Sequence, residues 1–109
     1  METFTYRVLV EFVRFFETPV FIRVLGKEYK VKVYLKKGMP CFVHTDGTEL
    51  LITQDHWDGV MRRIESLPVE EQELASSYDV LVWKDCPDPV FSLYLVGMVW
   101  SMNQVKGVL

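Results

Sequence analysis

The strongest constraint on the fold is a stretch of chain in which apolar residues alternate with charged or polar ones. From Tyr29 to Lys36, the apolar positions are Tyr29, Val31, Val33 and Leu35, and between them lie Lys30, Lys32, Tyr34 and Lys36. A period of two is typical of a strand with one buried and one exposed face. The segment from Val20 to Leu25 alternates in the same way, and Gly26-Lys27 can form a two-residue turn. We therefore predict a hairpin over residues 20–36.

A second hairpin is predicted over residues 41–53 because Asp46-Gly47 is a common type I′ turn pair. In this register Val43 lies opposite Leu50. The face expected to be buried carries Cys41, Val43, Leu50 and Ile52. Gly38 and Pro40 mark the link between the two hairpins, which favours a continuous antiparallel meander.

Beyond this hairpin the hydrophobic period changes to that of a helix. Apolar residues recur at Trp57, Val60, Met61 and Ile64, which is the stripe of an amphipathic helix over about residues 55–66. Thr53 or Asp55 can cap its start, and Pro68 follows its end. Tyr78 to Lys84 is predicted to return to strand.

Two segments have conflicting signals. Residues 4–16 are interpreted as a strand because they contain three Val, although Arg7, Glu11 and Arg14 also have the spacing of a helical stripe. Residues 90–100 follow Asp88-Pro89, a good helix start, yet they are rich in Val, Phe, Tyr and Trp. Strand and helix are equally favoured there.

The residue composition favours sheet, since the chain has seventeen Val and a single Ala. We predict an α+β fold with a mainly antiparallel sheet of four to six strands and one amphipathic helix packed on a face. A hydrophobic C-terminal element completes the core. A length of 109 residues without a linker or repeat predicts one domain, residues 1–109.

The chain is expected to be soluble and cytoplasmic, with no membrane segment. No signal peptide is recognised at the N-terminus, and the apolar stretch from Val90 to Trp100 is too short to cross a bilayer. Cys41 and Cys86 are therefore expected to be free thiols. Only four residues are Asn or Gln, a scarcity typical of thermophiles, and a small chain of this kind suits a viral accessory protein.

The most distinctive predicted surface is the outer face of the first hairpin. It combines cations and aromatic rings, which can contact phosphates and stack on unpaired bases. Its members are Phe21, Arg23, Lys30, Lys32, Tyr34 and Lys36. Arg23 and Lys30 are expected nearly opposite each other, an unfavourable pair without an anionic partner. Single-stranded nucleic acid is therefore a candidate ligand; the alternative is that these lysines solvate the sheet and protect its edge.

A second polar cluster has the residue types of a metal site. Its members are His44, Asp46, Asp55, His56 and Asp58, which are suitable ligands for zinc, manganese or iron. However, the turn, the helix cap and the first helical turn already explain the three acids. Cys41 and His44 point to opposite faces of one strand and cannot form a nucleophile and base pair. We expect no cofactor, and a metal-dependent enzyme is the second alternative.

Protein binding is the favoured function class. Residues 1–40 carry a net charge of +4 and residues 41–109 a net charge of −7, so two copies have complementary regions. Fifteen aromatic residues exceed what a small core buries, and surplus aromatic residues commonly anchor interfaces. We therefore expect a non-catalytic protein that binds another protein or forms a homodimer.

Overall fold

The computed structural model describes residues 2–15, 20–24, 27–43, 47–72 and 89–105, with the backbone alone for 20–24, 27–30, 71–72, 89–90 and 93. The fold is α+β with an antiparallel sheet and helices, which confirms the predicted class. In chain order the elements are α1 (Tyr6–Phe15), β1 (Val20–Val24), β2 (Lys27–Lys36), β3 (Met39–Val43), β4 (Glu49–Leu51), α2 (Gln54–Glu65), α3 (Val69–Gln72) and α5 (Pro89–Val105). The strand predicted at 78–84 lies outside the described residues.

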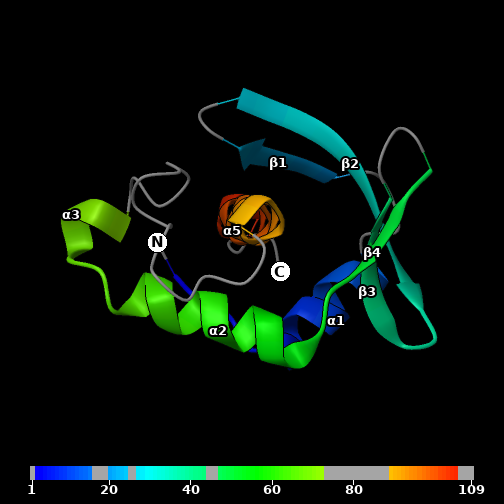
Figure 1. The fold of residues 1–109 in the computed structure, drawn as a ribbon, viewed down its shortest axis with the longest axis horizontal. Coiled ribbons are helices and arrows are strands. Elements are labelled where there is room, and N and C mark those ends of the chain that lie inside the picture. Colours follow the sequence, from blue (N-terminus) through cyan, green and yellow to red (C-terminus); the bar gives the residue numbers. More distant parts are fainter. Residues whose placement is uncertain (1, 16–19, 25–26, 44–46, 73–88, 106–109) are drawn as a thin grey trace.

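The strands follow one another as an antiparallel meander in the order β1-β2-β3-β4. The long strand β2 is shared between two ladders. Its first half pairs with β1, and its second half forms a three-stranded sheet with β3 and β4. β2 curves between the two ladders, so β1 lies on one side of the central helix and β3 and β4 lie at one end of the molecule (Figure 1).

The ladder between β1 and β2 contradicts the predicted Gly26-Lys27 turn, and the link between β2 and β3 contains Gly38 as expected. Val24 pairs with Lys27, so Lys27 belongs to β2 and not to a turn. As a result Arg23 lies opposite Glu28 rather than near Lys30, and the like-charge pair predicted there is wrong. The second turn is Lys37-Gly38, where φ is 52° and 80°. Two positive φ values are those of a type I′ turn, whose twist matches the flanking strands.

The second hairpin is shifted by one residue from the predicted register. Phe42 pairs with Leu50, and Val43 pairs with Glu49 instead of Leu50. The predicted buried face is wrong at Val43, which is only partly buried, because Phe42 points into the core instead. Cys41 and Ile52 are buried, as predicted. Phe42 makes edge-to-face contacts with Phe91 and Tyr94 of α5, each with ring centroids 6.1 Å apart. Burial of this large ring fixes the register, since a one-residue slip would turn it to the other face.

The strand predicted at residues 4–16 is wrong, because Tyr6–Phe15 forms α1. Leu9, Phe12 and Val13 recur at helical spacing and are buried against the core. The backbone nitrogen of Val8 donates to Thr5 Oγ1, 3.3 Å away, which caps the first turn. Contacts of this apolar stripe with β2 and β3 outweigh the strand preference of its Val residues.

Residues 89–105 form α5. The segment 90–100, for which strand and helix are equally favoured by the sequence, is therefore a helix. The helix contains no charged residue, and a helix that is apolar on all sides is stable when it is surrounded by protein. Figure 1 shows α5 between β1 and β2 on one side and α2 on the other. Leu95, Val96, Met98 and Val99 have no exposed surface. Across the described residues, no helix, α5 included, has both the length and the apolar character needed to span a membrane.

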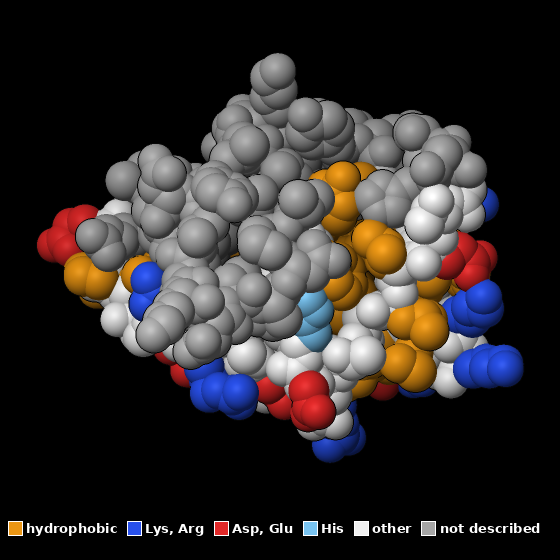
Figure 2. All heavy atoms as spheres, in the orientation of Figure 1, with side chains coloured by type: hydrophobic (Ala, Val, Ile, Leu, Met, Phe, Trp, Pro, Cys, Tyr) orange, Lys and Arg blue, Asp and Glu red, His pale blue; other side chains and the backbone are white. Residues whose placement is uncertain are grey.

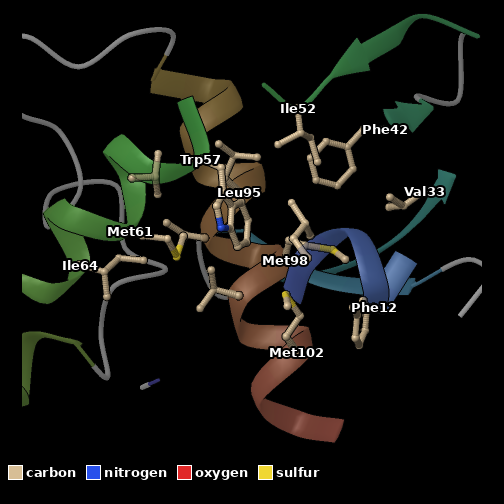
Figure 3. Packing of buried hydrophobic residues seen from close by; sticks show 14 of the residues in the cluster. Phe12, Val33, Phe42, Ile52, Trp57, Met61, Ile64, Leu95, Met98 and Met102 are labelled. Carbon is tan, nitrogen blue, oxygen red and sulfur yellow. The ribbon is translucent and has the colours of Figure 1, made fainter. Parts of the chain in front are cut away.

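The amphipathic helix predicted at about 55–66 is confirmed as α2, and its N-cap is Thr53. The predicted packing of this helix on a face of the sheet is wrong, because α2 packs mainly on the helices α5 and α1. The helices that pack on the strands are α5 against β1 and α1 against β2 and β3. Figure 3 shows Trp57 and Met61 of α2 on one side of α5 and Phe12 of α1 on another.

The N-terminal segment is held against α2 and α5 by side-chain hydrogen bonds. Trp57 Nε1 donates to the carbonyl oxygen of Phe4 over 2.8 Å. The Asn103 side chain accepts from the backbone nitrogen of Glu2 at 3.0 Å and donates to its carbonyl oxygen at 2.9 Å. These bonds satisfy polar groups beside the core and fix where α1 begins.

We expect Met98→Ala to lower the free energy of unfolding by about 2–5 kcal/mol, because it leaves a cavity in the middle of α5. Val69→Ala is the control, since Val69 is 73% exposed and should change stability by less than about 0.5 kcal/mol. Urea unfolding followed by circular dichroism measures both values. Equal losses for the two variants would contradict the central position of α5.

Candidate binding surface

Three of the six predicted binding residues, Lys32, Tyr34 and Lys36, lie on one face of the three-stranded sheet. Residues directly opposite in a ladder share a face, so the pairing defines the whole surface. We call it the outer face; it consists of Lys32, Tyr34, Lys36, Met39, Cys41, Val43, Glu49 and Leu51. The opposite face carries Val33, Phe42 and Leu50 and belongs to the core.

Glu49 connects the two neighbouring polar side chains of the outer face. Its Oε1 accepts a hydrogen bond from the Tyr34 hydroxyl at 2.5 Å, and its Oε2 accepts one from Lys36 Nζ at 2.5 Å. Glu49 lies on β4 and both donors lie on β2, so the side chain spans β3. The carboxylate therefore neutralises Lys36 and fixes the orientation of the Tyr34 ring.

These bonds change the proton affinities of all three groups. The hydrogen bond to Glu49 raises the pKa of Tyr34 to about 12, since the phenol donates to a carboxylate. The same carboxylate raises the pKa of Lys36. Hydrogen bonds from Lys36 and then from Tyr34 lower the pKa of Glu49. At neutral pH the cluster thus holds one anion, one cation and one neutral phenol.

Cys41 belongs to the outer face by register, yet its side chain is fully buried. It lies opposite Tyr34 on β2 and Leu51 on β4, in the part of β3 that Glu49 spans. Burial, followed by the charge of Glu49, raises the pKa of the Cys41 thiol. Cys41 is a free cysteine, as predicted, and its environment is the opposite of one that activates a nucleophile. Cys86 lies outside the described residues.

The structure places the six predicted binding residues less closely together than the sequence indicated. Lys32 is exposed, Lys36 is half exposed and Tyr34 is partly buried. Phe21, Arg23 and Lys30 lie on the β1–β2 ladder, where only the backbone is described. There Phe21 is opposite Lys30, and Arg23 is opposite Glu28, which removes the electrostatic reason for an anionic ligand at that pair.

The predicted metal cluster is divided between described and undescribed residues. His44 and Asp46 lie outside the described residues. Asp55 is exposed in the first turn of α2, and Asp58 lines a hollow of about 300 Å³ between α2 and the N-terminal segment. Within the residues that the structure describes, no three His, Cys, Asp or Glu side chains are close enough to hold a metal ion.

His56 forms a polar pair inside the fold. Its Nε2 lies 3.1 Å from the Ser92 hydroxyl, and its ring stands edge-on to Phe91 with centroids 4.7 Å apart. Ser92 has no exposed surface, so no substrate can approach its hydroxyl. The pair therefore satisfies a buried polar group at the start of α5 and does not form a nucleophilic site.

One surface of the molecule does not follow from a strand at residues 4–16 and exists because these residues form α1. The outward surface of α1 carries Arg7, Val8, Glu11, Arg14 and Phe15. Phe15 is 79% exposed, more than any other large hydrophobic residue among those described. The Arg7, Glu11 and Arg14 stripe was the signal that would have revealed this helical surface.

Comparison with protein-family models, with curated proteins and with solved structures gives no match.

We expect Glu49→Gln to make Tyr34 ionise at lower pH. In the native protein the phenol is stabilised in its neutral form, so Tyr34 stays protonated at about pH 11 and ionises only near pH 12. The stabilisation is complete below the ordinary pKa of 10.0 and is lost as the pH rises through 12. Ultraviolet difference spectra of tyrosinate measure the transition, and Tyr34→Phe identifies it. An unchanged transition in Glu49→Gln would show that Glu49 does not hold the phenol.

We also expect the Glu49 cluster to make stability fall with acid. Because the pKa of Glu49 is lowered, its contribution is present above the ordinary value of 4.5 and is lost as the pH falls through the lowered pKa. Lys36→Met removes the largest cause of that shift, so the acid dependence of the free energy of unfolding becomes shallower. Urea unfolding between neutral pH and about pH 3 measures it. In a Glu49→Gln background, Lys36→Met should have no such effect, and an equal effect would contradict the pairing.

Proposed function

We propose that this protein is a non-catalytic protein-binding module that acts as a homodimer. The observation that carries the proposal is Phe15, a large aromatic side chain that is 79% exposed at the end of α1. Exposed aromatic residues are costly to leave in water and are enriched as interface anchors. An isolated exposed aliphatic residue needs no explanation, but a phenyl ring exposed to this degree favours a binding role.

Two further large hydrophobic side chains are exposed. Val8 on α1 is 41% exposed, and Leu51 on β4 is 43% exposed. α1 contacts β2 and β3, and β4 pairs with β3. Figure 2 shows hydrophobic side chains gathered toward the end of the visible face that carries β3 and β4 in Figure 1, with basic and acidic side chains along its outer edge. An apolar centre with a charged rim is the usual anatomy of a protein interface.

Single-stranded nucleic acid is the alternative ligand. Lys32, Lys36 and Lys37 are exposed around Tyr34, which is the residue pattern of a stacking surface with cations. Against it, the Glu49 carboxylate already occupies Lys36 and the Tyr34 hydroxyl. A carboxylate in the middle of the surface repels phosphates, so we rank this function below protein binding.

The test is the molar mass of the purified chain in solution. We expect a concentration-dependent rise toward twice the 12.8 kDa chain mass in light scattering across micromolar and higher concentrations. A monomer mass at every concentration would overturn the proposed homodimer. In the same experiment series, a fluorescent oligo(dT) probe at low salt tests the alternative. Salt-sensitive binding that Lys32→Glu abolishes would favour nucleic acid instead.

A further inference from the structure

A hollow in the surface lies where the end of α1 meets β2. Its volume is about 310 Å³, and it is lined by Val13, Arg14, Tyr34 and Leu35. Val13 and Leu35 supply apolar walls, while Arg14 and Tyr34 place polar groups at the hollow. A buried cavity of about 150 Å³ in another protein is enough to hold benzene, so this hollow has room for a phenyl ring.

Phe15 does not line the hollow, although it follows Arg14 directly in the helix. A large exposed ring and a hollow of suitable size therefore both lie at the C-terminal end of α1. We infer that Phe15 of a second copy of this chain occupies the hollow, and that the exchange is reciprocal around a two-fold axis. This inference rests on the proposed homodimer and names its contact.

Two-fold symmetry follows from the positions of the ring and the hollow. In a two-fold interface the same patch meets itself, so each protruding group must lie close to the recess that receives its counterpart. Phe15 and the hollow meet this condition because residues 13 and 14 line the hollow and residue 15 protrudes. Both contacts form at once and the assembly closes as a dimer, without a free site that would extend it.

The charges of the α1 surface are also self-complementary. Arg14 Nη1 lies 2.9 Å from Glu11 Oε1, and both side chains are more than half exposed. Around a two-fold axis near Phe15, Arg14 of each copy comes close to Glu11 of the other, so opposite charges meet. Arg14 also lines the hollow, so its guanidinium is within reach of an incoming phenyl ring, on which such a group can stack. Val8 lies two turns before Phe15 on the same stripe and adds apolar contact area.

The first test is Phe15→Ala, with Val69→Ala as the matched control. Both residues are highly exposed, at 79% and 73%, so neither change should unfold the protein. α3, which carries Val69, lies at the opposite end of the molecule from β3 and β4 (Figure 1). We expect Phe15→Ala to raise the Kd of self-association by about tenfold or more, and Val69→Ala to leave it unchanged. Sedimentation equilibrium measures both.

The second test uses charge reversal on separate chains. Glu11→Arg gives a surface with cations at both positions, and Arg14→Glu gives one with carboxylates at both. Each variant alone should associate more weakly than the native chain, because like charges meet across the axis. An equimolar mixture should associate at least as well as the native chain. A change confined to the ion pair within one helix would not be rescued by mixing.

The outcomes separate the two proposals. A native chain that stays monomeric overturns the homodimer itself. A native dimer that Phe15→Ala does not weaken, or charge variants that mixing does not rescue, overturns the Phe15 contact and leaves the homodimer standing. Weakening by Phe15→Ala together with rescue on mixing supports both.

Discussion

The fold depends on the burial of α5. A helix of seventeen residues without a single charge has no side that is stable in water, so protein must surround it. β1 packs on one side of it, α2 on another, and Phe42 of β3 reaches it through aromatic contacts. The other elements are therefore arranged so that together they cover the apolar surface of α5.

The same constraint leaves α1 with an exposed surface. Because α5 takes the centre, α1 fully buries only the stripe of Leu9, Phe12 and Val13 against β2, β3 and α2. Tyr6 and Val10 are partly buried, and the Tyr6 hydroxyl donates to the carbonyl oxygen of Ile52. The other residues of the helix are exposed, including Phe15 at its end. The exposed Phe15 ring and the hollow therefore both lie where α1, a short helix, ends at the edge of the core.

The sequence predicted those elements whose signals are local and agree with one another. β2 and α2 have clear periods of two and of 3.6, and Thr53 caps α2 as expected. Prediction from the sequence is wrong where the local conformational preference of a segment disagrees with its packing against distant parts of the chain. The Val residues of α1 favour strand, but their neighbours Leu9 and Phe12 are needed to cover the core, which no local pattern reveals. Within the candidate site, Lys32, Tyr34 and Lys36 were identified, whereas Phe15 was missed together with the helix that exposes it.

The role of Glu49 depends on hydrogen bonds that reach from β4 across β3 to β2. Its position on β4 pairs it with Val43, yet its carboxylate reaches Tyr34 and Lys36 on β2. A sequence pattern gives the composition of a strand face but not the diagonal contacts between strands that are not neighbours. This contact neutralises Lys36 and occupies the Tyr34 hydroxyl, while Lys32 stays exposed on the same face. A carboxylate among the cations weakens the outer face as a phosphate-binding site.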